Sequence, residues 1–160
     1  MHIIERDHEI CMAHRLYKHE GKCSQIHGHN YIIKFSFTGE CLDNVGRIAD
    51  FADIKTGICN WLDENWDHRT MLYVGDPLAE KLKVYDPSVI ISDHNPTAEN
   101  MAAMIYYKAW EIYKGTGIRI KEVKVWETQK CMASYSVKYS SRFTDEASNY
   151  IKGEANEKDS

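Results

Sequence analysis

The chain has 160 residues, of which 43% are hydrophobic and 28% charged, and this is the length and composition of a single soluble globular domain. Its formal net charge of −4 argues against nucleic acid as the main partner, and no apolar run reaches the roughly 18 residues needed to span a membrane. A charged N-terminus unlike a signal peptide, and five cysteines without zinc-finger spacing, predict a cytoplasmic protein with free thiols.

The first third of the chain predicts two β-strands joined by a polar loop. Weak alternation of apolar and polar residues indicates the first strand, and clearer alternation indicates the second, which turns at Gly39. The loop between them carries Cys23. The expected elements are a strand over residues 3–14, the loop over 15–26 and a strand over 27–38.

Three histidines lie where these two strands predict a common inward face. His27 and His29 are two residues apart, so on a strand they point to the same side. That side continues with apolar residues, namely Tyr31, Ile33, Phe35 and Phe37. His14 ends the first strand on the face of Ile10 and Met12.

Three imidazoles at the mouths of neighbouring inward faces predict a zinc site. Three protein ligands leave a fourth position open, as in catalytic rather than structural zinc centres. Cys23 lies four residues before His27 and could reach over that position. The alternative is that these are surface or hydrogen-bonded core histidines, since a His-x-His pair is common by chance.

The second part of the chain predicts two helices followed by two strands. Apolar residues at helical spacing indicate the first helix, and Thr97 caps the second, which Gly115 ends. Asp67 and His68 are expected in a loop. The expected elements are a helix over about 51–64, a broken stretch over 73–95 with a candidate short strand at 89–91, a helix from Thr97 to about 114, and strands over 123–128 and 133–139.

Glu127 ends the inward apolar face of the first closing strand, after Val123 and Val125. A carboxylate there is costly unless it reaches the rim or binds a polar group in a pocket. The order strand-strand-helix-helix-strand-strand predicts an α+β fold with an antiparallel sheet. We expect one domain over residues 1–140 and a polar acidic tail over 141–160.

Six short motifs, in this order, resemble the family of 6-pyruvoyl-tetrahydropterin synthases and 6-carboxy-tetrahydropterin synthases (QueD). They are Ala13-His14-Arg15, Cys23-x3-His27-Gly28-His29, Asp50-Phe51-x3-Lys55, Asp67-His68, Pro96-Thr97-x-Glu99-Asn100 and Glu127-Thr128. The resemblance implies the tunnelling fold (T-fold), a four-stranded antiparallel sheet with two helices on one face. It also implies subunits joined edge to edge in a homo-oligomer, expected to be a hexamer of two trimers, with pockets between subunits.

The resemblance also implies a role for each candidate site residue. His14, His27 and His29 would hold Zn²⁺, and Cys23 would be the catalytic base. Asp67 and His68 would form a second acid/base element. Adjacent residues rarely pair directly, so Asp67 is expected to orient a different imidazole of the assembled site. That imidazole can belong to the same subunit or to another one. The expected substrate contacts are Glu127 and Thr97 for the pterin, and Lys55 and Arg15, with Lys22 and Arg69, for the triphosphate.

The reaction that the resemblance implies starts from 7,8-dihydroneopterin triphosphate. The three-residue gap between Cys23 and His27 resembles the carboxy synthases, which give 6-carboxytetrahydropterin, acetaldehyde and triphosphate in 7-deazaguanine (queuosine) synthesis. The alternative within the family is a 6-pyruvoyl-tetrahydropterin synthase, which eliminates triphosphate and keeps the side chain. An alternative of another class is a non-catalytic zinc- or pterin-binding protein in which Cys23 is a fourth zinc ligand.

Overall fold

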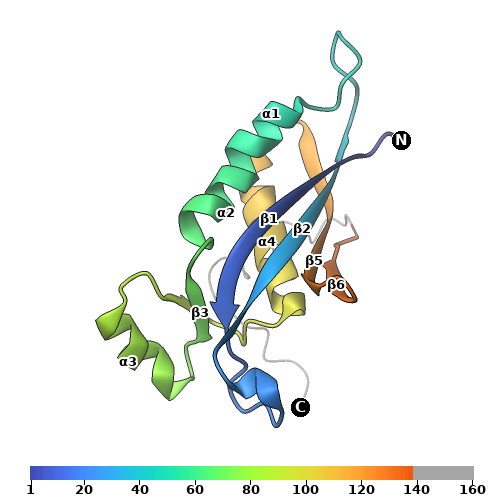
Figure 1. Cartoon of the computed structure of the whole chain (residues 1–160). Coiled ribbons are helices and arrows are strands. Elements are labelled where there is room, and N and C mark those ends of the chain that lie inside the picture. Colours follow the sequence, from blue (N-terminus) through green and yellow to red (C-terminus); the bar gives the residue numbers. More distant parts are fainter. Residues whose placement is uncertain (139–160) are drawn as a thin grey trace.

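The computed structural model describes residues 1–138, which form one six-stranded sheet with helices packed on it (Figure 1). Tyr139 of the last expected strand and the expected acidic tail lie outside the described residues. Across the sheet the strands follow the order β4-β3-β1-β2-β5-β6. Their bounds are β1 Ile4–His14, β2 His27–Gly39, β3 Thr70–Tyr73, β4 Ile90–Ser92, β5 Ile118–Thr128 and β6 Cys131–Tyr135.

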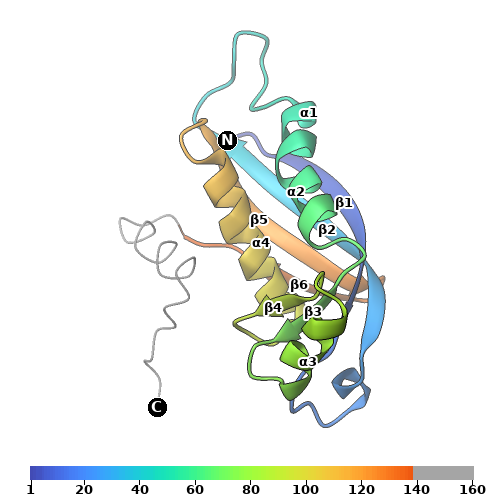
Figure 2. The same ribbon diagram turned by 90° about the vertical axis from the view of Figure 1, so that its left-hand side faces the viewer.

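The helical segments bear out the two helices expected from the sequence and add a third. They are α1 Phe51–Ile54, the π-helical segment η2 Lys55–Cys59, α2 Asn60–Asn65, α3 Pro77–Tyr85, α4 Ala98–Tyr113 and a 3-10 turn, η1, at Lys22–Ser24. The first three form one helical run, and α4 lies beside this run against β5 and β6 (Figure 2). None of the helices within residues 1–138 combines the length and apolarity needed to cross a membrane.

The antiparallel pairing of β1 with β2 fixes one buried face. His14 lies opposite His27, Met12 opposite His29 and Ile10 opposite Tyr31. Because side chains alternate along each strand, these residues share one side of the sheet. The inward face predicted from alternation is therefore confirmed.

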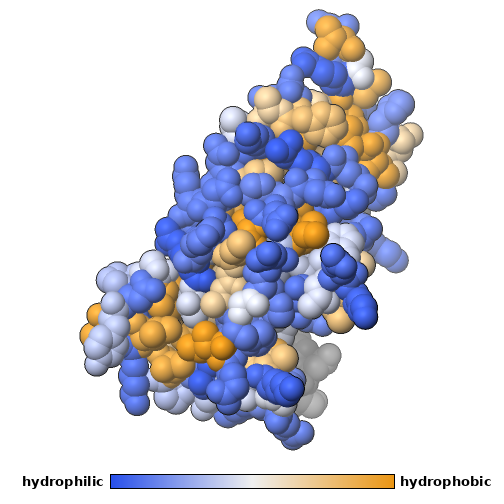
Figure 3. Space-filling view, in the orientation of Figure 1, coloured by the Kyte–Doolittle hydropathy of each residue, from blue (hydrophilic) through white to orange (hydrophobic). Residues whose placement is uncertain are grey.

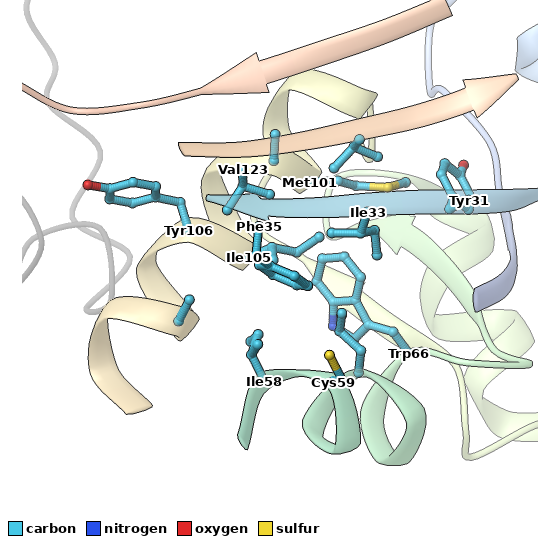
Figure 4. Close-up of a cluster of buried hydrophobic side chains, with 14 of the residues drawn as sticks. Tyr31, Ile33, Phe35, Ile58, Cys59, Trp66, Met101, Ile105, Tyr106 and Val123 are labelled. Carbon is cyan, nitrogen blue, oxygen red and sulfur yellow. The ribbon is translucent and has the colours of Figure 1, made fainter. Parts of the chain in front are cut away.

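The core lies between this face and the helices (Figure 4). Tyr31, Ile33 and Phe35 of β2 are each at most 1% exposed, and Ile58 of η2 and Ile105 of α4 pack against the same cluster. Continuous apolar packing along β2 holds the end of the strand that carries His27 and His29 in a fixed position.

The π-helical segment has a local cause. The Tyr113 hydroxyl donates to the Ile54 carbonyl and accepts from the Ile58 amide, each at 3.2 Å. An α-helix would pair that carbonyl and that amide with each other, so the hydroxyl is inserted into the hydrogen-bond ladder. Gly57 leaves room for it, since a Cβ there would lie 2.5 Å from the Tyr113 oxygen.

The expected four-stranded antiparallel sheet is wrong in its number of strands, although the α+β class is confirmed. The four expected strands pair antiparallel as β1, β2, β5 and β6, but β3 and β4 extend the sheet beyond β1 in parallel. The helix α3 joins the two added strands. The cause is a second small core beneath α3, formed by Leu72, Ala79 and Val89.

Exposed apolar side chains gather at two ends of the molecule in Figure 3. One group includes Leu42, Val45 and Phe51, near the loop between β2 and α1. The other includes Val74 and Val84, at and before α3. The first group follows the end of β2 that lies away from His27.

Candidate functional site

The three histidines meet at one end of the β1–β2 pair. One ring nitrogen from each of His14, His27 and His29 lies within 4.8 Å of those of the other two. The ring centroids are 4.6 Å apart for His14 and His27, 4.9 Å for His27 and His29, and 5.3 Å for His14 and His29. The pairing of His14 with His27 and the two-residue step to His29 produce this cluster.

Backbone carbonyls set the tautomers of two of these rings. His14 Nδ1 lies 2.6 Å from the Pro96 carbonyl oxygen, and His27 Nδ1 lies 2.8 Å from that of Gln25. A carbonyl only accepts, so each Nδ1 carries the proton and each Nε2 presents a lone pair. His14 Nε2 is buried and has no hydrogen-bond partner.

This donor set fits a zinc ion. An unpartnered buried lone pair is rare in proteins unless a ligand completes it. Neutral imidazoles whose other nitrogen is bound to a carbonyl are the usual form of zinc-ligating histidine. His14, His27 and His29 are therefore placed so that they could hold a metal ion such as zinc.

Burial keeps His14 and His29 neutral. Burial lowers the pKa of His14 from 6.5 to about 4, with smaller contributions from His27 and His29, despite the opposing bond to Pro96. Burial also lowers the pKa of His29, against the opposing effect of Glu127. At neutral pH both rings are in the form that binds metals.

The low pKa of His14 predicts acid sensitivity of the metal-free protein. Between pH 6.5 and pH 4 the unfolded chain binds a proton that the folded chain does not, so the free energy of unfolding falls as the pH falls. From pH 7 to pH 5 the expected loss is about 2 kcal/mol. Urea unfolding of the metal-free protein and of His14→Gln measures it, and an equal pH dependence in both proteins would contradict this cause.

Glu127 reaches the cluster from β5. Its Oε1 lies 4.0 Å from His14 Nε2, and its side chain is 27% exposed. The pairing of β5 with β6 is irregular between Trp126 and Thr128, and such bulges re-aim side chains next to sites. The carboxylate therefore lies at a solvent-accessible edge of the histidine cluster.

Tyr31 adds a buried hydroxyl beside the histidines. Its ring lies 5.4 Å from that of His29 and 5.8 Å from that of His14, and its hydroxyl has no hydrogen-bond partner. Burial raises its pKa, and the charges of Glu127 and Cys23 raise it further. The hydroxyl therefore stays protonated, as a donor inside the site.

Cys23 lies beside the cluster rather than in it. It is half-buried in η1, and its carbonyl accepts from the Leu16 amide at 2.8 Å. Within residues 1–138 the group of mutually close donor atoms consists of the three histidines, without the Cys23 sulfur. Cys23 lies near enough to Tyr31 to contribute to the raised pKa of its hydroxyl, after burial and Glu127.

Asp67 and His68 form a dyad at the edge of β1. Asp67 accepts from the Cys11 amide and pairs with His68 Nδ1, each at 2.7 Å. The expectation that neighbouring residues would not pair is wrong here, because His68 has a φ of 57°, which turns its ring back onto Asp67. Burial opposes but does not outweigh the hydrogen bonds from Cys11 and His68, which lower the pKa of Asp67.

The dyad does not join the histidine cluster in its own chain. It is bonded to the backbone amide and carbonyl of Cys11, three residues before His14, and the His68 side chain is 78% exposed. Within residues 1–138 neither residue of the dyad belongs to the group of mutually close donor atoms formed by His14, His27 and His29. Its exposed imidazole is available to another molecule.

The other residues predicted to contact the substrate lie in separate parts of the structure. Thr97 caps α4 directly after Pro96 and is therefore next to the cluster. Arg15 forms a bidentate ion pair with the buried Asp76, with distances of 2.6 and 3.1 Å. Lys55 is exposed one turn after Phe51, which lines a hollow with residues at the start of β1, away from the histidine end.

Three residues that shape the site were not predicted from the sequence. Asp76 caps α3 as well as holding Arg15, and an Asp followed by Pro is a helix-start signal that could have revealed it. Asn95 and the Tyr31 hydroxyl had no comparable signal, because their contacts depend on which distant residues the fold brings near.

The chain resembles proteins of one family over most of its length. A family model described as 6-pyruvoyl tetrahydropterin synthase matches residues 3–138. A 6-carboxy-5,6,7,8-tetrahydropterin synthase of Rickettsia bellii is 30% identical over 126 residues, which are 77% of this chain and 91% of the relative. A Halobacterium salinarum protein described as a probable 6-carboxy-5,6,7,8-tetrahydropterin synthase is 35% identical over 106 residues, covering 65% of this chain and 67% of the relative.

Solved structures share the fold. An uncharacterized protein from Wolinella succinogenes superposes with a TM-score of 0.75 at 19% identity, covering 86% of this chain and 98% of that one. The 6-pyruvoyl tetrahydropterin synthase of Caenorhabditis elegans superposes with a TM-score of 0.63 at 25% identity, covering 85% of this chain and 95% of that one. The chain therefore shares the architecture of these solved structures over most of its length.

Proposed function

The chain belongs to the 6-pyruvoyl tetrahydropterin synthase family, and on this premise we propose that it is a zinc-dependent 6-carboxy-5,6,7,8-tetrahydropterin synthase. The proposed reaction converts 7,8-dihydroneopterin triphosphate to 6-carboxytetrahydropterin, acetaldehyde and triphosphate, a step towards 7-deazaguanines such as queuosine. The observation that carries the proposal is the cluster of three imidazoles, with the unpartnered Nε2 of His14, near Cys23 and Glu127. The names of the curated relatives support the carboxy product.

In this proposal His14, His27 and His29 hold the metal and leave a position for substrate. Bound zinc would polarise the hydroxyl oxygens of the substrate side chain and make its protons more acidic. Carbonyl bonds at Nδ1 orient the rings of His14 and His27, and burial keeps His14 neutral. Their role is to fix the substrate side chain relative to the thiol.

Cys23 is the proposed base, and Glu127 the proposed pterin anchor. A thiol on the η1 turn can take a proton from the substrate side chain if it is partly thiolate. The positive charge of a bound zinc ion would favour the thiolate. Glu127, 27% exposed at the edge of the cluster, can accept from the pterin amino group and a ring N–H as a charge-assisted pair. Thr97, at the N-terminus of α4, is a further proposed pterin contact.

The triphosphate needs basic groups at the pocket rim. Lys55 is exposed, whereas Arg15 is engaged by Asp76, so Arg15 would have to share its guanidinium between a carboxylate and a phosphate. Because Lys55 lies towards the other end of β1, we propose that it acts on the site of a neighbouring subunit.

We further propose that Asp67 and His68 serve a neighbouring subunit in a homo-oligomer, expected to be a hexamer. The dyad is formed within the chain, its imidazole is exposed and lies outside the group of three histidines, and β6 lies at an edge of the sheet, where another strand could pair. Each site would then combine Cys23 of one chain with His68 of the next.

Mixed oligomers test this sharing. Cys23→Ala and His68→Ala are each expected to be inactive, but subunit exchange between them should restore activity to about a quarter of wild type, because about a quarter of sites then draw both intact residues. Triphosphate release before and after mixing measures the restored activity. Asn44→Ala serves as the control for both inactive variants. If the mixture stays inactive although exchange is complete, the dyad does not act across subunits.

Release of triphosphate from 7,8-dihydroneopterin triphosphate by the purified protein tests the proposed function. We expect zinc-dependent turnover that a chelator abolishes and zinc restores. Release without a carboxylated pterin would favour the pyruvoyl synthase, whose name the matching family and the C. elegans structure carry. Binding of pterin without any release would instead favour the non-catalytic alternative.

A further inference from the structure

The Asn95 side chain forms two hydrogen bonds with the loop that carries Cys23. Its side-chain oxygen accepts from the Tyr17 amide at 2.8 Å, and its side-chain nitrogen donates to the Tyr17 carbonyl at 3.1 Å. A single amide group thus satisfies both backbone polar groups of a residue 78 positions away.

Tyr17 is the point where the loop is attached. The next residue back, Leu16, donates its amide to the Cys23 carbonyl at 2.8 Å, so the two arms of the loop are joined beside Tyr17. In the described chain, the other hydrogen bonds of residues 18–24 stay inside the loop region. The position of the Cys23 backbone therefore depends on how firmly Tyr17 is held.

Asn95 is itself braced by the start of α4. The Asn100 side chain donates to the Asn95 carbonyl at 2.9 Å, and the Asn100 amide donates to the Thr97 hydroxyl at 3.3 Å. Pro96, between Asn95 and Thr97, is buried, and its carbonyl accepts from His14 Nδ1 at 2.6 Å. One three-residue segment, 95–97, therefore contacts both the loop of the proposed base and a ligand of the proposed metal site.

From these contacts we propose that Asn95 is a positioning residue that sets the Cys23 loop relative to His14, with Asn100 as its brace. The proposal rests on the proposed function only for its catalytic consequence. Its structural part, the anchoring of residues 17–23, stands on the hydrogen bonds alone.

The test compares Asn95→Ala, Asn95→Asp and a control, Asn44→Ala, at an exposed site in the loop between β2 and α1. In Asn95→Ala, trypsin is expected to cleave after the exposed Lys18 and Lys22 at least about tenfold faster, because the loop opens more often. Asn95→Asp keeps the acceptor for the Tyr17 amide and loses the donor, so its cleavage rate should lie in between. Asn44→Ala should behave as wild type.

The catalytic readout separates positioning from binding. Zinc content should stay stoichiometric, because the three histidines and the Pro96 carbonyl remain. In Asn95→Ala kcat is expected to fall roughly ten- to hundredfold with little change in KM, since misplacing a reacting group by about 1 Å costs up to about that factor. Asn95→Asp should recover part of kcat.

Each outcome bears on one claim. Unchanged cleavage after Lys18 and Lys22 in a folded Asn95→Ala protein would overturn the anchoring, whatever its activity. Faster cleavage with a wild-type kcat would overturn the positioning role. If the wild-type protein has no turnover at all, the proposed function fails, while the cleavage rates and the rate of Cys23 alkylation by iodoacetamide in the three variants still decide the anchoring. If Asn95→Ala does not fold, the milder Asn95→Asp carries the same comparison.

Discussion

Replacing Cys23 by alanine is expected to lower turnover by about a hundredfold or more while leaving zinc bound. This is the usual scale for the loss of a general base. Zinc should remain because the mutually close donors are the three histidines, without the Cys23 sulfur. Pterin affinity should also remain, because Glu127 at the edge of the cluster is untouched. Metal content, pterin binding and triphosphate release of this variant measure the three effects.

The matched control is Cys41→Ala, because Cys41 is an exposed free thiol outside the site. It should keep wild-type turnover. In the wild-type protein, iodoacetamide should modify Cys23 faster than the buried Cys59, and bound substrate should protect it. If Cys23→Ala loses zinc together with activity, the thiol is a fourth metal ligand and the base assignment is refuted.

Replacing both His27 and His29 by alanine is expected to abolish zinc binding and turnover in a folded protein. Even changing the hydrogen-bond partner of a metal ligand costs about 10–100-fold in metal affinity, so losing two ligands should cost more than about a hundredfold. The fold should survive, because Tyr31, Ile33 and Phe35 carry the core beyond the cluster. Zinc titration and circular dichroism measure the two outcomes.

His2→Ala serves as the control for this variant, because His2 is exposed at the opposite end of the β1–β2 pair. It should bind zinc as wild type. Stoichiometric zinc in a triple variant of His14, His27 and His29 would show that these histidines do not hold the metal.

Alternation made the main strands readable from the sequence, whereas β3 escaped it. β1 and β2 are long enough for period-two patterns to stand out, and their register brings His14 opposite His27. β3 has only four residues and was not predicted. The candidate short strand at 89–91 corresponds to β4, but its parallel pairing with β3 was not predicted. Asp76 and Pro77 read as chain breakers, but they begin α3.

The candidate site also has parts that the sequence predicts and parts that it does not. Residues on one strand face, such as His27 and His29, are related by local geometry that a sequence displays. The contacts of His14 with Pro96 and of Tyr17 with Asn95 span 82 and 78 positions, and no local rule predicts such pairs. The direct pairing of Asp67 with His68 needed the left-handed backbone of His68, which residue type alone does not indicate.

The central claim, that this chain makes 6-carboxytetrahydropterin, is tested most directly by mass spectrometry of its reaction with 7,8-dihydroneopterin triphosphate. We expect 6-carboxytetrahydropterin together with acetaldehyde and triphosphate, formed by the zinc-loaded protein and not by the Cys23→Ala variant. Unchanged substrate, or a pterin that keeps its full side chain, after incubation with the zinc-loaded wild-type protein would contradict the claim.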